Sequence, residues 1–70
     1  MAQTRTTRRR ASTLKIGERF SHDNQWHLVR NVCPLQASHL MPLHDPHGDP
    51  AGRSSNLPSD DEVVEVLIAD

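Results

Sequence analysis

The chain has 70 residues, of which 34% are hydrophobic, and its formal net charge is −1. This length allows one domain, and the single Cys excludes an intramolecular disulfide. No apolar run approaches the roughly 18 residues of a membrane-spanning helix, and no apolar segment follows the charged start as it would in a signal peptide. We therefore expect a small cytoplasmic protein without a membrane partner.

The charge is distributed unevenly along the chain. Residues 1–12 contain four Arg and no acidic residue, whereas residues 45–70 contain seven acidic residues and one Arg. Residues 1–12 also lack apolar periodicity, so they bury too little surface to offset the entropy lost on ordering. We therefore predict that residues 1–12 form a disordered basic arm and that residues 13–69 form the folded domain.

The first part of the folded domain predicts two strands that fold against each other. Apolar residues alternate before Phe20, and the segment Ser21–Gln25 carries polar side chains that favour a turn. The clearest strand is Gln25–Val32, in which Trp26 and Leu28 lie on one face. We therefore predict that Phe20, Trp26 and Leu28 pack together in one small core.

The rest of the chain predicts a loop and three more strands. The loop covers residues 33–38, and the strand candidate His39–His44 contains a proline, which favours the edge of a sheet. The turn residues of 45–52 separate this strand from a partner at 53–57. The Val-rich segment Glu62–Ile68 favours a closing strand whose even-numbered aliphatic residues face the core.

Two sequence patterns carry a resemblance to a known fold. Leu57-Pro58-Ser59 runs directly into the last strand, and the run K-x-G-E-R-F is followed by W-x-L-V. In these features the chain resembles SH3-like small β-barrels of bacterial and phage type. The resemblance implies an all-β fold, with a five-stranded barrel over residues 13–69. Peptide-binding SH3 domains line a groove with several aromatic residues, whereas this chain has one Trp, one Phe and no Tyr.

The sequence lacks the patterns expected of an enzyme. It contains no Gly-rich phosphate loop, no HExxH and no G-x-S-x-G motif. Cys33, His39, His44 and His47 supply zinc-ligand types, but their spacing matches no standard zinc motif. Solvated loop histidines and a small buried Cys are the alternative. We therefore expect a non-enzymatic protein with no cofactor and no metal.

One functional hypothesis is a protein-interaction module that acts as an adaptor or modulator of a larger complex. An extended partner segment would add to an exposed sheet edge, and we predict His39, Met41 and Leu43 as the contacts. The partner is either a second copy of the chain or a host complex of a phage or mobile element. This hypothesis is favoured because residues 13–70 carry nine acidic and four basic side chains.

The alternative hypothesis is a nucleic-acid-binding barrel in which the basic arm neutralises backbone phosphates of DNA or RNA. The predicted contacts are the basic side chains of the arm and the first strands: Arg5, Arg8, Arg9, Arg10, Lys15, Arg19 and Arg30. The shortage of aromatic residues disfavours this hypothesis, because stacking on exposed rings commonly supports single-strand binding.

Overall fold

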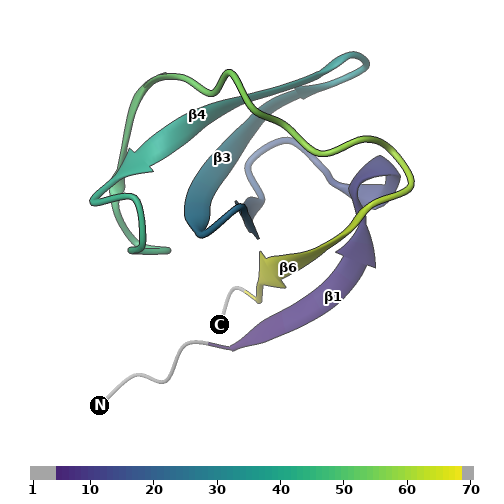
Figure 1. The fold of residues 1–70 in the computed structure, drawn as a ribbon, viewed down its shortest axis with the longest axis horizontal. Helices are drawn as coiled ribbons and strands as arrows, with labels where there is room; N and C mark the ends of the chain where they lie inside the picture. Colours follow the sequence, from purple (N-terminus) through teal and green to yellow (C-terminus); the bar gives the residue numbers. More distant parts are fainter. Residues whose placement is uncertain (1–4, 69–70) are drawn as a thin grey trace.

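The computed structural model of the chain describes residues 5–68. These residues form one antiparallel sheet of six strands in the order β1-β6-β2-β3-β4-β5 (Figure 1), with no α-helix. The strands are β1 Thr6–Arg10, β2 Arg19–His22, β3 Gln25–Val32, β4 Leu35–Met41, β5 Asp49–Arg53 and β6 Val63–Leu67, and a short 3₁₀ helix, η1, covers Ala11–Thr13. The predicted all-β class is confirmed.

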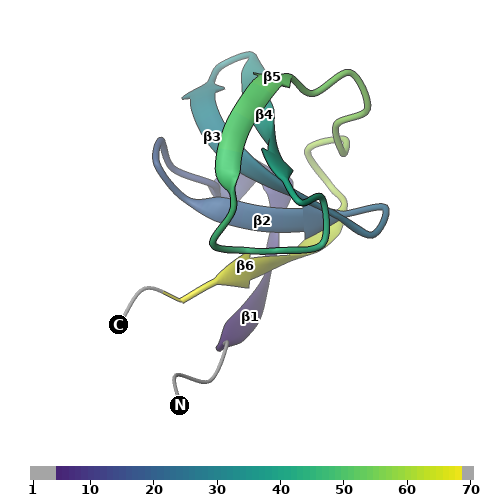
Figure 2. The ribbon, with the colours of Figure 1, turned by 90° about the vertical axis from the view of Figure 1, so that its left-hand side faces the viewer.

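The sheet is curved but not closed. In Figure 2, strand β2 runs across the direction of β4 and β5. β1 and β5 stand at the two ends of the strand order and do not pair with each other. The prediction of a closed five-stranded barrel is therefore wrong in strand number and in closure, because the additional strand β1 pairs with β6 alone.

β1 arises from the segment predicted to be a disordered arm. All five of its residues pair with β6, from Thr6 opposite Leu67 to Arg10 opposite Val63. The predicted disorder is wrong over this range because backbone hydrogen bonds to the Val-rich β6 order a segment that buries little surface of its own. Residues 1–4 of the predicted arm lie outside the described residues.

β2 and β3 form a hairpin with a two-residue turn. The turn residues Asp23 and Asn24 have φ values of 55° and 63°, as in a type I′ turn. This turn places Phe20 opposite His27. His27 and Val29 therefore share the face of Phe20, because successive residues of a strand point to opposite sides.

The prediction that Trp26 and Leu28 share a core with Phe20 is therefore wrong. A five-residue tip would place Phe20 opposite Trp26, whereas the observed two-residue turn shifts the pairing by one residue and exchanges the faces of β3. Trp26 is nevertheless only 8% exposed. By the same alternation it shares the opposite face with the fully buried Leu40.

The main core cluster draws on β2, β3, β4, β6 and the segment after β1. It contains Ala11, Leu14, Phe20, Val29, Ala37, Val64 and Val66, with Leu35 and Leu57 packed against it. The inward orientation predicted for Val64 and Val66 is confirmed, whereas Ile68 is 43% exposed. Ala11 reaches the core because its backbone N–H donates to the carbonyl of Glu62 at 2.8 Å.

The strands β3 and β6 match their predicted positions closely, but β4 and β5 do not. β4 begins at Leu35, within the predicted loop 33–38, and β5 covers Asp49–Arg53, mostly within the predicted turn 45–52. In both places the turn occupies fewer residues than its Pro and Gly content predicts. β4 and β5 therefore each begin before the predicted residue.

His27 is a buried ionisable residue in this sheet. It is 2% exposed, and its ring stacks on Phe20 with a centroid separation of 5.1 Å. Its Nδ1 lies 2.5 Å from the hydroxyl of Ser54, and Nε2 has no hydrogen-bond partner among residues 5–68. Burial lowers the pKa of His27, and the charges of His22 and His39 lower it further. The fold therefore favours the neutral ring.

We expect stability to depend on the protonation of His27. Because the pKa of His27 is lower in the folded chain, the unfolded chain binds the proton more readily. The stabilisation is complete above the ordinary His pKa of about 6.5 and declines as the pH falls toward the lowered value. Urea unfolding should show a free energy that decreases between about pH 7 and pH 5.

The variant His27→Leu should flatten this pH dependence, because it removes the buried titrating ring. His47→Gln is the matched control, since His47 is exposed. A pH dependence that is the same in His27→Leu as in the unaltered chain would contradict the assignment.

Candidate functional site

The free edge of β1 is the first candidate site. Within the described sheet, β1 has β6 as its one neighbour. The N–H of Ile68 donates to the carbonyl of Arg5, and the N–H of Ala11 donates to that of Glu62, so odd-numbered residues of β1 form the ladder. By the alternation of antiparallel pairs, the backbone groups of Thr6, Arg8 and Arg10 point away from β6.

One outward group of β1 already has a partner inside the chain. The hydroxyl of Thr13 donates to the carbonyl of Arg10 at 2.7 Å, which agrees with the outward direction of that carbonyl. Thr6 and Arg8 therefore present both of their backbone groups at the border of the sheet (Figure 1), and Arg10 presents its N–H. β1 contains neither Pro nor Gly, so its edge is continuous.

The exposed cations of this edge are Arg8 and Arg10. Both are exposed, and they lie on the same face of β1 because they are two residues apart. Arg8 is the register partner of Glu65. Among residues 5–68 neither guanidinium forms an ion pair with a carboxylate. Two cations are therefore available beside the outward backbone groups.

Arg9, which was also predicted to bind nucleic acid, has a structural role instead. Its Nη1 and Nη2 each donate to an oxygen of Glu18 at 2.8 Å, and Nη2 also donates to the carbonyl of Thr13. The hydrogen bond from Arg9 lowers the pKa of Glu18, and Glu18 in turn raises the pKa of Arg9. This ion pair ties β1 to the turn that precedes β2.

The remaining residues predicted to bind nucleic acid are dispersed. Arg19 donates from Nη1 to the carbonyls of Pro46 and Gly48, both at 2.9 Å, and so holds the loop between β4 and β5. Arg5 and Lys15 are exposed. The structure thus leaves Arg5, Arg8, Arg10 and Lys15 available and commits Arg9 and Arg19 to internal contacts.

The predicted partner edge at His39, Met41 and Leu43 is wrong. β4 lies between β3 and β5, so its backbone is paired on both sides. His39 is half-buried, and the backbone carbonyl of Leu43 accepts from the N–H of Trp26 at 2.7 Å. Met41 is exposed, but its strand offers no free edge. The prediction failed because β5 forms within the segment predicted to be a turn.

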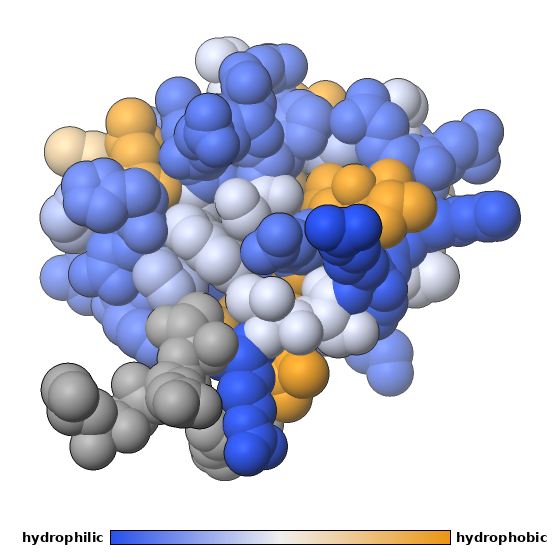
Figure 3. Space-filling model, turned by 60° about the horizontal axis from the view of Figure 1, so that its bottom comes forward, coloured by the Kyte–Doolittle hydropathy of each residue, from blue (hydrophilic) through white to orange (hydrophobic). Residues whose placement is uncertain are grey.

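Exposed hydrophobic side chains are few among residues 5–68. The large ones are Ile16, Val32, Met41, Val63 and Ile68. On the face shown in Figure 3, apolar surface appears as small patches separated by hydrophilic side chains. Contiguous apolar patches mark many protein interfaces, so recognition by backbone and charge suits this molecule better.

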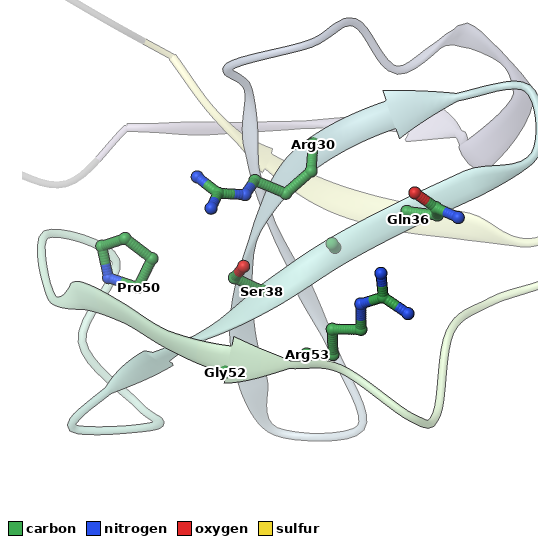
Figure 4. A pocket seen from close by; sticks show the side chains of 7 residues that line it. Arg30, Gln36, Ser38, Pro50, Gly52 and Arg53 are labelled. Carbon is green, nitrogen blue, oxygen red and sulfur yellow. The ribbon is translucent and has the colours of Figure 1, made fainter.

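A cavity of about 380 Å³ on the β3–β4–β5 face is the second candidate site. Arg30 from β3 and Arg53 from β5 line this cavity on the two sides of β4, which carries Ser38 (Figure 4). Arg30 was among the predicted binding residues, but Arg53 was missed. The sequence signal for Arg53 is the glycine before it, since Gly within a strand indicates a bulge.

No protein family, curated protein or solved structure matches this chain. The SH3-like relationship therefore stays a prediction. Among residues 5–68, no three His, Cys, Asp or Glu side chains are grouped as a metal site would require. The same residues contain no helix with the length and hydrophobicity to cross a membrane.

Glu18→Gln should test the ion pair that fixes β1. We expect it to lower the free energy of unfolding by about 1 kcal/mol near pH 7, because a charged pair of hydrogen bonds becomes a weaker neutral one. The pKa of Glu18 is lowered in the fold, so its contribution is present above the ordinary value of 4.5 and is lost as the pH falls.

Urea titrations at two pH values measure this difference. Glu65→Gln is the matched control, because Glu65 is exposed and forms no ion pair within residues 5–68. Equal losses of stability in Glu18→Gln and Glu65→Gln would show that the Arg9–Glu18 pair has no special role.

Proposed function

We propose that the protein is a non-enzymatic interaction module that binds an extended segment of a partner protein along the free edge of β1. The observation that supports this most directly is the outward direction of the backbone groups of Thr6 and Arg8. An extended peptide can continue the ladder there, and its main-chain hydrogen bonds supply affinity. A relationship to SH3-like domains is part of this proposal.

The charges beside this edge indicate an acidic partner segment. Arg8 and Arg10 lie on one face of β1 without carboxylate partners among residues 5–68. Opposite charges directly across a strand pair contribute roughly 0.2–1 kcal/mol each. A segment with acidic residues at alternate positions therefore complements the edge in both backbone and charge.

The other edge of the sheet is less suited to strand addition. β5 contains Pro50, which has no N–H to donate, and Gly52, which has a φ of 83°. The pairing of β4 with β5 also shifts register between Ser38 and Leu40. Proline and bulges are the features that protect edge strands from pairing. This difference between the two edges favours β1 as the edge to which a partner strand adds.

A second candidate function is binding of DNA or RNA by the same cations. The exposed Arg5, Arg8, Arg10 and Lys15 support it, since each can neutralise a backbone phosphate. The two functions differ in one physical requirement. Strand addition needs the outward N–H of Arg8, whereas phosphate binding needs only its charge.

The comparison of Arg8→Pro with Arg8→Gln separates these requirements. Both variants remove the charge, but only proline removes the N–H, and that N–H makes no ladder bond to β6. The probe is a short synthetic peptide of alternating Glu and Val, with alternating Lys and Val as its control. We expect Arg8→Pro to bind the acidic peptide about fivefold more weakly than Arg8→Gln, as measured by titration calorimetry.

A single-stranded oligonucleotide serves as the second probe. Equal peptide affinity in Arg8→Pro and Arg8→Gln, together with an oligonucleotide affinity that falls equally in both, would reject strand addition and favour nucleic-acid binding. Retained chemical-shift dispersion of β6 amides in the NMR spectrum is the check that Arg8→Pro still folds.

A further inference from the structure

Two β-bulges place the side chains of the cavity on the β3–β4–β5 face. Val29 pairs with Ala37 and Asn31 pairs with Gln36, so Arg30 is the extra residue on β3. A bulge of this kind redirects a side chain and is common beside functional sites. Arg30 therefore occupies a position that a regular strand would not give it.

The second bulge lies across the cavity on β5. Ser38 pairs with Arg53 and Leu40 pairs with Pro50, so β5 has one residue more than β4 over this interval. Gly52 in this interval has a φ of 83°, a conformation that L side chains rarely adopt. A Cβ at Gly52 would also lie 3.2 Å from the His39 ring. Glycine thus sets the position of Arg53.

The cavity holds two cations without an anion. Within residues 5–68, neither Arg30 nor Arg53 forms an ion pair or a side-chain hydrogen bond. Arg9 and Arg19, in contrast, are held by such contacts. Guanidinium groups that share a concave polar site raise the local concentration of anions. Both groups carry fork-shaped sets of donors suited to an oxoanion.

Ser38 adds a neutral donor to the floor of this cavity. It is 6% exposed, and its hydroxyl has no protein hydrogen-bond partner among the described residues. The Ser38 hydroxyl is not among the buried side-chain atoms of residues 5–68 that lack a partner, so it reaches the open space of the cavity and can donate to a ligand there. Gln36, which also lines the cavity, contributes an amide. The donors therefore lie on three sides of one space (Figure 4).

We propose that Arg30, Gln36, Ser38 and Arg53 form a binding site for the phosphate group of a phosphate ester. A carboxylate offers two oxygens, whereas a phosphate offers three or four and can accept from both guanidinium groups and the hydroxyl together. The cavity of about 380 Å³ leaves room beyond the phosphate for the group that carries it. The Pro50 ring supplies an apolar wall for that group.

Inorganic phosphate is the first probe. Titration of the labelled chain, monitored by NMR, should shift the amides of Gln36, Ser38 and Gly52, whereas chloride at the same ionic strength should not. Arg30→Gln and Arg53→Gln should each weaken phosphate binding about tenfold, since a charged hydrogen bond contributes about 1.5 kcal/mol or more. The charge-conserving Arg30→Lys should give an intermediate loss.

Arg8→Gln is the matched control, because Arg8 is an exposed arginine on β1, at the other end of the strand order. An equal loss in Arg8→Gln and Arg30→Gln would overturn the proposal, because it would show nonspecific attraction to positive charge. Absence of the three amide shifts would also overturn it. The NMR spectrum of each variant shows whether it folds.

Two further probes identify the source of the phosphate. A mononucleotide with a 5′-phosphate carries a monoester, and a short single-stranded oligonucleotide without terminal phosphates carries only diesters. Either should displace inorganic phosphate, and tighter binding of one assigns the site to that source. Failure of both to compete would contradict an ester ligand.

Discussion

The pairing of β1 with β6 is the interaction on which the rest of the structure depends. Because of this pairing, β6 has a neighbouring strand on each side, β1 and β2. Its alternate residues Val64 and Val66 lie in the core. The continuation of the same pairing brings Ala11 into that core. Arg9 reaches Glu18 from this position, so an Arg-rich segment becomes an ordered border of the sheet.

The same pairing explains why the protein can present both backbone and charge to a partner. Odd-numbered residues of β1 bond to β6, and even-numbered residues are left to face outward. The charges separate in the same way. Arg9 is neutralised within the chain, whereas Arg8 and Arg10 stay free of ion pairs among residues 5–68. Charged residues on an edge also discourage self-association.

Sequence reasoning predicted elements with strong local signals and missed those set by pairing. The aliphatic alternation of β6 and the length of β3 follow from the residues themselves. The face of β3 does not, because it depends on whether the turn at Asp23 and Asn24 has an even or odd number of residues. β1 was missed because its order comes from a strand more than fifty residues away.

The candidate sites also combine features that have a local sequence signal with features that depend on strand pairing. The exposure of Arg30 could be predicted from its place in an otherwise apolar strand, and the structure confirms it. That Arg30 lines one cavity with Arg53 could not be predicted, because the two residues lie at bulges in different strands. Gly52 is the one local signal of the second bulge. The free edge was assigned to residues 39–43 because β5 was not expected beside them.

Amide hydrogen exchange along β1 is the most direct test of this pairing. We expect the N–H groups of Thr7, Arg9 and Ala11 to be protected by bonds to β6, and those of Thr6, Arg8 and Arg10 to exchange rapidly in the same strand. Rapid exchange at all six positions would contradict the pairing, and protection of the even-numbered residues instead would contradict the free edge.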